Sequence, residues 1–196
     1  MKKPGHKPHQ NSATSWFRKA FNLELPHLGT ACTVLMISTL SNRISNGHFL
    51  SIASKMPGIR FRLVLHETIN DDVIRNYMGI LPANCNVYGA QNDLLAFYKE
   101  AHLVLNLSAP GEDSTISDRS ILEAMACGRP VMVPDQDGKY DMVTNGREGF
   151  RIDPNNENKL LTMIRELCSD ARIHYRFSVA ARETALHFPL KQISQH

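Results

Sequence analysis

The amino-acid sequence predicts an α/β fold with a doubly wound, Rossmann-like parallel sheet. Two apolar runs, Thr33–Ile37 and Leu103–Leu107, are continuous over the length of a strand, which is typical of strands buried on both faces. Between and after these runs, apolar residues recur at helical spacing. Strands that alternate with helices in this way indicate a parallel sheet with right-handed crossovers and helices on both faces.

Each element has its own local signal in the chain. The expected strands are Thr33–Ile37, Arg60–His66, Cys85–Tyr88, Leu103–Leu107 and Pro130–Val133. The expected helices are Gly47–Met56, a helix from about Asp71, Asn92–Ala101, Ile121–Cys127, Glu157–Cys168 and Ala171–His187. Asp71 and Asp72 are placed to cap the helix that begins there, and Gly128 is placed to end its helix in a left-handed conformation.

The length of 196 residues suits one domain of ordinary size. We expect residues 1–29 to form an N-terminal tail and connector, and residues 30–196 to form the folded domain. The four cysteines, Cys32, Cys85, Cys127 and Cys168, stand singly without metal or redox spacing. The expectation is therefore a set of reduced thiols in a cytoplasmic protein.

Charge and hydrophobicity exclude several classes of partner. The formal net charge is only +3 and no dense Lys/Arg patch is present, so we expect no nucleic acid. The apolar runs are far shorter than the roughly 20 residues of a spanning helix, so we expect no transmembrane segment. Association with a membrane at its periphery stays open.

The predicted topology places a ligand site at one edge of the sheet. In open α/β sheets the crevice lies beyond the carboxyl ends of the strands, near the point where the strand order reverses. The loops that would form it are Ser38–Gly47, Gly89–Asp93, Ser108–Ser120 and Pro134–Asp141. The third of these feeds a helix N-terminus, whose free amides and dipole favour an anion such as a diphosphate.

The helix and strand that follow this loop read ILEAMACGRPVMVPDQDG, from Ile121 to Gly138. This stretch resembles the E-A-M-A-x-G-x-P-V hallmark of the C-terminal, donor-binding domain of GT-B glycosyltransferases of group 1, the GT4 family. The segments VLMISTLSNRISNG, LPANCNVYGAQNDLLAFYKEAHLVLNLS and MVTNGREGFRIDPNNENKL are similar to further family passages and occur in the same order. The resemblance implies a single GT-B C-terminal lobe that binds a nucleotide sugar.

The resemblance also implies roles for residues in the third loop and its helix. Glu123 matches the second Glu of the family's E-x7-E motif, which binds the ribose hydroxyls; the alternative is a helix-surface Glu that pairs with a nearby base. Thr115 replaces the first Glu, and Glu112 stands three residues earlier. The remaining donor-binding candidates of this stretch are Ile116, Ser117, Arg119 and Ser120, with Asp118 where the family has a glycine.

A second departure concerns the family's basic pair, which neutralises the diphosphate. Thr39 and Asn46 occupy the positions of its Arg and Lys, whereas Gly47 is kept. Arg43 lies in the same loop and is the candidate replacement, although an exposed, solvated Arg is an equal alternative. The sequence assigns no catalytic residue.

Two functions follow from these observations. The first is a donor-binding domain for hexosyl transfer with retention, without a metal or cofactor, that needs a missing N-terminal acceptor lobe or a partner chain. The alternative is a degenerate, non-catalytic GT-B-like binding module, because the chemically active residue types are replaced by Thr115, Asp118, Thr39 and Asn46. The sequence specifies neither the base, the sugar, the acceptor nor the oligomeric state.

Overall fold

The structure is a computed structural model that describes residues 10–29, 31–109, 112, 115–136 and 139–188. Its centre is a six-stranded, all-parallel sheet in the order β3-β2-β1-β4-β5-β6. The strands are β1 (Thr33–Ser38), β2 (Arg60–Leu65), β3 (Cys85–Tyr88), β4 (Leu103–Leu105), β5 (Val131–Pro134) and β6 (Gly149–Ile152). This arrangement confirms the predicted α/β, Rossmann-like class.

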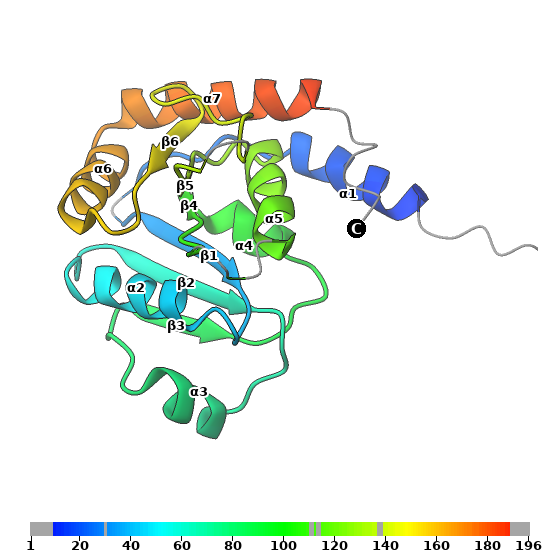
Figure 1. Cartoon of the computed structure of the whole chain (residues 1–196). Coiled ribbons are helices and arrows are strands. Elements are labelled where there is room, and N and C mark those ends of the chain that lie inside the picture. The colour runs from blue at the N-terminus through cyan, green and yellow to red at the C-terminus, as the bar shows by residue number, and fades with distance from the viewer. Residues whose placement is uncertain (1–9, 30, 110–111, 113–114, 137–138, 189–196) are drawn as a thin grey trace, which may run out of the picture.

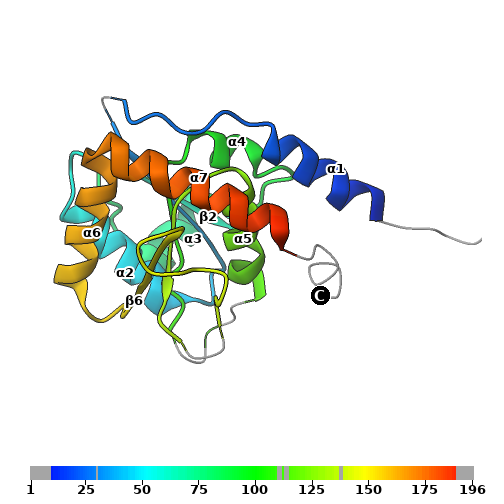
Figure 2. The same cartoon turned by 90° about the horizontal axis from the view of Figure 1, so that it is seen from above.

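Helices cover both faces of the sheet (Figures 1 and 2). The helices are α1 (Gln10–Phe21), α2 (Arg43–Ser54), α3 (Asp71–Met78), α4 (Leu95–Glu100), α5 (Thr115–Ala126), α6 (Glu157–Ser169) and α7 (Ala171–His187). One core joins the sheet to α2 and α6, and the other joins it to α1, α4 and α5. Helix α7 contributes to both, through Phe177 to the first and Ala181 to the second.

The central strand β1 explains why the fold has two cores. All six of its residues are buried, and it pairs with β2 on one side and β4 on the other. Alternate side chains face opposite cores, so Val34 packs in the α2–α6 core and Leu35 in the α5 core. A strand of this kind needs apolar residues at every position, as the sequence pattern indicated.

The strand predictions are confirmed for β1 to β5 within a few residues, whereas β6 was not predicted. The strand is short, and it carries both Gly149 and the charged Arg151. Gly149 is required because a Cβ atom there would lie 1.7 Å from the carbonyl oxygen of Val131 on β5. A glycine that permits close backbone approach looks like a turn signal in a sequence.

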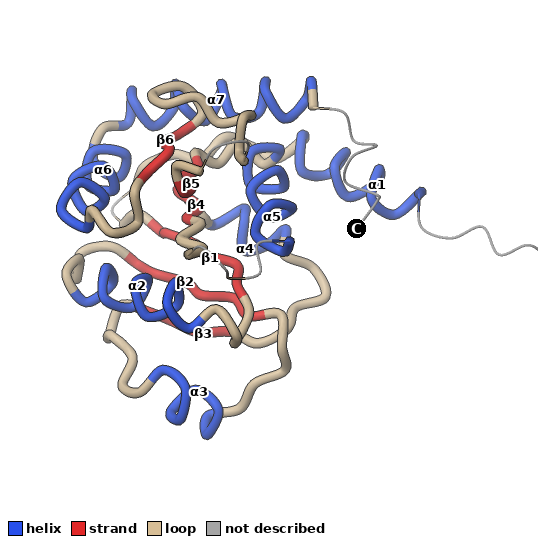
Figure 3. The backbone as a smooth tube through the Cα atoms, in the orientation of Figure 1, coloured by secondary structure: helices blue, strands red, loops and turns tan. Residues whose placement is uncertain are grey.

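The starts of three helices differ from the predictions: α2 begins at Arg43 and not at Gly47, α4 begins at Leu95 and not at Asn92, and α5 differs most, whereas α3 begins at Asp71 as predicted. Helix α5 begins at Thr115 and not at Ile121, a difference that arises because its polar first turns lack the apolar spacing that indicates a helix (Figure 3). Helix α3 is capped by Asn70, whose side chain accepts a hydrogen bond from the amide of Val73 at 2.9 Å; Asp71 lies inside the first turn. Gly128 has φ of +69° and ends α5 as predicted.

Part of the segment that was expected to be a tail and connector, residues 16–28, packs against the folded domain. On α1, Phe17 and Ala20 are buried against the α5 side of the sheet. Further along, the carbonyl oxygen of Leu23 accepts a hydrogen bond from Arg182 of α7 at 2.7 Å. The domain boundary at residue 30 stays a prediction. These contacts hold wherever the boundary is placed.

The expectation of four reduced cysteines is wrong for one pair. Cys32, directly before β1, forms a disulfide with Cys168 near the end of α6. Their 136-residue separation leaves no local spacing by which a sequence could reveal the pairing. Cys85 and Cys127 are free and buried, and burial raises the pKa of both thiols to about 12.

None of the helices in the described part of the chain has the length and hydrophobicity that a bilayer-spanning helix requires.

Acid is expected to destabilise the fold through His174. Its ring is 1% exposed, and Nε2 lies 2.7 Å from the carbonyl oxygen of His102. Burial lowers the pKa of His174 from 6.5 to about 4, so the unfolded chain takes up a proton that the folded chain does not. The free energy of unfolding should therefore fall between about pH 6.5 and pH 4, by at most ~3 kcal/mol.

Urea unfolding at several pH values measures this loss in wild type and in His174→Gln. The variant should show a shallower dependence on pH, whereas replacement of the exposed His66 by Gln should leave the slope unchanged. An unaltered slope in His174→Gln would contradict the assignment.

Candidate functional site

A cavity of about 640 Å³ lies at the carboxyl edge of the sheet, where the strand order reverses between β1 and β4. Ile37 and His66 mark the ends of β1 and β2 in its wall, and residues 91–94 of the loop after β3 form another side. Helix α5 contributes Ile116, Asp118, Arg119, Ser120, Leu122 and Glu123. The remaining walls are Trp16 of α1, Met142 and Phe188.

Glu123 is one of three carboxylates that line this cavity, with Asp93 and Asp118, and it is only 5% exposed. Its Oε1 accepts a hydrogen bond from Arg119 Nε at 2.8 Å, one helical turn earlier on α5. Its Oε2 lies 3.1 Å from the Tyr98 hydroxyl of α4. Both oxygens thus have a partner, and these two contacts give the carboxylate a fixed position.

Tyr98 is a site residue that the sequence did not reveal. It is fully buried, and its hydroxyl is also 3.2 Å from the carbonyl oxygen of Ser120. Burial, and then the negative charge of Glu123, raise the pKa of Tyr98 well above its ordinary value, so the hydroxyl keeps its proton and donates it. In a sequence, a tyrosine on a helix is indistinguishable from ordinary core.

Trp16 closes the cavity from the N-terminal side. Its Nε1 donates a hydrogen bond to Asp93 Oδ1 at 3.3 Å, and its ring lies edge-on to Tyr98 with 6.0 Å between centroids. Asp93 Oδ1 also accepts from the amide of Leu95 at the start of α4. The segment before the sheet is thereby attached to the same loop that borders the cavity.

Glu112 does not line this cavity. Its carboxylate lies at the N-terminus of α2, where it accepts hydrogen bonds from the amide of Ile44 at 3.1 Å and from Ser45 Oγ at 2.7 Å. A weaker bond from the Ser45 amide, at 3.4 Å, and a bond from Ala109 complete the set. Asn42, the cap residue of α2, makes no side-chain cap bond, so Glu112 supplies that cap from a distant loop.

The predicted donor-binding residues Arg43, Asn46 and Gly47 lie in the first turns of α2, not in a loop as predicted, and none of them lines the cavity. Arg43 stacks on the Tyr77 ring of α3, with 5.2 Å from its Cζ to the ring centroid. Asn46 is buried, and its Nδ2 donates to the carbonyl oxygen of Thr39 at 2.8 Å. Gly47 is exposed on α2, and these residues border a separate hollow of about 80 Å³.

The first turns of α5 hold the other predicted residues. Thr115, Ile116 and Ser117 are helical, and the side chains of Thr115 and Ser117 lie outside the described residues. Asp118 Oδ1 is a buried atom without a hydrogen-bond partner. A carboxylate in this position opposes the favourable dipole of the helix N-terminus toward a second anion.

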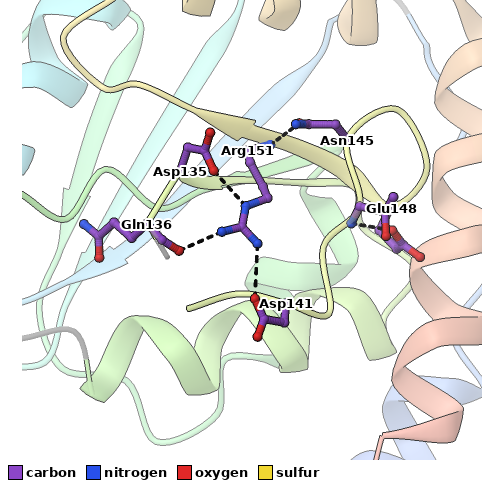
Figure 4. Close-up of polar contacts among 7 residues, drawn as sticks. Asp135, Gln136, Asp141, Asn145, Glu148 and Arg151 are labelled. Atoms are coloured by element: carbon purple, nitrogen blue, oxygen red, sulfur yellow. Dashed lines mark hydrogen bonds and ion pairs between the residues drawn. The ribbon is translucent and has the colours of Figure 1, made fainter. Parts of the chain in front are cut away.

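The loop between β5 and β6 is fastened by Arg151 (Figure 4). Its Nε pairs with Asp135 at 2.9 Å, its Nη1 with Asp141 at 3.4 Å, and its Nη2 donates to the carbonyl oxygen of Gln136 at 2.6 Å. The hydrogen bond and charge of Asp135 raise the pKa of the Arg151 guanidinium, which stays charged. Arg151 thereby ties Asp135 and Gln136 to Asp141, next to Met142 of the cavity wall, and the described residues of the predicted loop Pro134–Asp141 do not themselves line the cavity.

Comparison with known proteins assigns the family. Residues 31–170 match the family described as "Glycosyl transferases group 1", which is well over half of the chain. The chain belongs to the group 1 glycosyl transferases. A stretch of 53 residues is also 38% identical to sucrose synthase 6 of Arabidopsis thaliana, covering 27% of this chain and 6% of that protein.

Several solved structures share the fold. The glycosyltransferase of Rickettsia africae is 18% identical with a TM-score of 0.71, over 91% of this chain and 52% of its own. HepE of Anabaena, solved in complex with UDP and glucose, is 22% identical with a TM-score of 0.70, over 95% and 51%. The C-terminal domain of a group 1 protein of Francisella tularensis is 14% identical with a TM-score of 0.57, over 91% and 93%.

The share of each matched structure that the chain covers indicates which part of a group 1 transferase it resembles. The chain spans about half the length of the Rickettsia and Anabaena chains, and it covers nearly all of the isolated Francisella C-terminal domain. The likeness to a C-terminal lobe agrees with the predicted single lobe. At these identities the structures establish the fold, and the roles of individual residues remain predictions.

Removal of the Glu112 carboxylate tests whether that residue is structural. Glu112→Ala should lower the unfolding free energy by about 1–2 kcal/mol, because the amides of α2 lose their cap. For a chain of this size the melting temperature should fall by about 2–8 °C. Differential scanning calorimetry measures the change, with Glu183→Ala on the exposed surface of α7 as the matched control. Equal melting of the two variants would refute the capping role.

Proposed function

We propose that the cavity at the carboxyl edge binds the nucleoside diphosphate part of a nucleotide sugar, as the donor site of a group 1 glycosyl transferase. The observation that carries the proposal is the buried Glu123 carboxylate, held in a cavity of about 640 Å³ at the switch point of a sheet of this family. The complex of HepE with UDP and glucose, a protein of the same fold, supports a uridine nucleotide as the first ligand to test.

The contacts of Glu123 suit a carboxylate that accepts hydrogen bonds from the two vicinal hydroxyls of a ribose. Tyr98 lies wholly in the core and continues to hold Oε2. Arg119 is 61% exposed, so its bond to Oε1 is easily exchanged for a bond from a ribose hydroxyl. The released guanidinium then faces the start of α5, where a diphosphate would lie. A ligand is thus proposed to replace the ion pair rather than to add to it.

The site offers little charge for a leaving diphosphate. Arg119 is the only cation among the described residues that line the cavity, and Asp118 faces the same space. Loss of one donor to developing charge typically costs on the order of 10²–10³ in rate. We therefore propose that transfer needs further basic groups from an acceptor lobe, in a longer chain or in a partner chain.

Three related expectations remain proposals of the same kind. We propose hexosyl transfer with retention, and donor binding without a metal. In the completed enzyme, the anomeric configuration of the product tests the first proposal, and the effect of EDTA on donor binding tests the second. A cytoplasmic location is proposed from the sequence, although the Cys32–Cys168 disulfide weighs against it because structural disulfides are rare in a reducing compartment. A count of free thiols in protein isolated from cells shows whether Cys32 and Cys168 are reduced or form the disulfide.

Isothermal titration calorimetry with UDP, GDP and ADP in the presence of EDTA tests the donor site. One nucleotide should bind with a dissociation constant of about 1–50 µM, and Glu123→Gln should weaken it about tenfold or more because one charged acceptor is lost. Tyr98→Phe should weaken binding less, since it frees the carboxylate without removing it. Glu183→Gln on the exposed surface of α7 should bind as wild type.

A folded chain that binds none of the nucleotides would overturn this proposal. The non-catalytic module would then be the better account, because Thr39 and Asn46 supply no charge at the positions of the family's basic pair. Binding that survives in Glu123→Gln would place the ligand elsewhere.

A further inference from the structure

A second cavity, of about 620 Å³, lies at the opposite edge of the sheet, where the strands begin. Thr33 and Arg60 are the first residues of β1 and β2, and His102 directly precedes β4. Residues 22–27, which lead from α1 to the sheet, form the facing wall. Its size falls in the range of small-molecule sites, and it shares no lining residue with the Glu123 cavity.

Arg129 lines this amino-edge cavity in an unusual state for a charged side chain. It is 1% exposed, and its Nε and Nη1 have no hydrogen-bond partner. Its Nη2 makes only two long bonds, 3.4 Å to the carbonyl oxygen of Glu24 and 3.3 Å to that of Lys99. None of the ion pairs among the described residues includes Arg129. A buried cation normally has an anionic partner, because burial without one is costly.

The groups around Arg129 add positive charge. Arg60 and Lys99 line the same cavity and are exposed; Arg60 makes one long hydrogen bond, 3.4 Å from Nη2 to the carbonyl oxygen of Ala31. Burial, and then the charges of Arg129 and Arg60 among other causes, lower the pKa of His102. Of the two carboxylates at the cavity, Glu100 already pairs with Arg62 at 2.5 Å, and Glu24 is exposed. The cavity therefore has a surplus of cations and one buried guanidinium without a counter-ion.

We propose that the amino-edge cavity binds a phosphoryl oxyanion, with Arg129 as the buried ligand and Arg60 and Lys99 at its mouth. The planar guanidinium matches a tetrahedral oxyanion, and the long Nη2 bonds to carbonyl oxygens are readily exchanged for shorter, charge-assisted ones. The space exceeds one phosphate, so the group is either free phosphate or the phosphate of a small sugar phosphate. Bound there, the anion joins the segment after α1 to the start of the sheet.

Thermal unfolding in phosphate, compared with chloride at equal ionic strength, tests this site. At 20 mM phosphate and a millimolar dissociation constant, the melting temperature should rise by about 5 °C. Arg129→Met should abolish the rise, and Arg129→Lys should keep part of it. Arg172→Met, which removes a charge from the exposed surface of α7, should respond as wild type. Glucose 6-phosphate in place of phosphate distinguishes the sources, because a sugar phosphate site would saturate at lower concentration.

A second readout does not depend on how well a variant folds. The side-chain Nε–H signal of Arg129, assigned in 15N-arginine-labelled wild type, should shift saturably with phosphate. A phosphate effect that disappears in Arg119→Gln, and not in Arg129→Met, would place the anion in the Glu123 cavity and overturn the proposal. An Arg129 signal that stays fixed throughout the titration would also overturn it. The first result would favour anion binding in the Glu123 cavity, whereas the second would leave nucleotide binding at Glu123 untouched.

Discussion

The parallel pairing of β1 with both β2 and β4 is the constraint on which the rest of the structure depends. It makes β1 the switch point, so that the loops after β1 and β4 leave the sheet toward opposite faces and open a crevice between them. The same pairing buries β1 on both faces and forces helices onto each. Glu123 reaches this crevice because α5 follows β4 and packs beside β1.

Two carboxylates near the carboxyl edge of the sheet hold neighbouring loops. Glu112 caps α2 from the β4–α5 loop, and Glu67 after β2 accepts a bifurcated bond from the amide of Leu40 in the β1–α2 loop, at 3.1 and 3.0 Å. Each of these bonds fixes a neighbouring loop by its backbone. Arg129, a buried arginine whose Nε and Nη1 have no hydrogen-bond partner, lies at the amino edge, away from the crevice. The two edges of the sheet therefore differ in the charge they offer.

The sequence predicted the sheet, and it indicated where to look for a candidate site, because both inferences depend on local patterns. Continuous apolar runs identify buried strands, and the E-A-M-A-x-G-x-P-V stretch locates Glu123 on its helix. What it missed depends on contacts between distant segments. Cys32 meets Cys168, and Glu112 meets Ser45, only once the sheet has brought their loops together. Periodicity and spacing carry no signal for such pairs.

Residues of the site that lie on ordinary core elements were missed for a related reason. Tyr98 and Trp16 have no motif, and their roles follow from packing against Glu123 and Asp93. Arg43 was chosen by its place in the loop, and its side chain stacks on Tyr77 instead. A loop position predicts proximity to the crevice, but the direction of a long side chain depends on the neighbours that the fold supplies.

The most direct test of a donor site at Glu123 is the fluorescence of Trp16, the single tryptophan of the chain and a residue of the cavity wall. Its emission should change saturably as the preferred nucleoside diphosphate is added, and phosphate at equal ionic strength should leave it unchanged. The change should require far higher concentrations in Glu123→Gln. Emission that stays constant to millimolar nucleotide, in protein shown to be folded by circular dichroism, would contradict the assignment of this cavity.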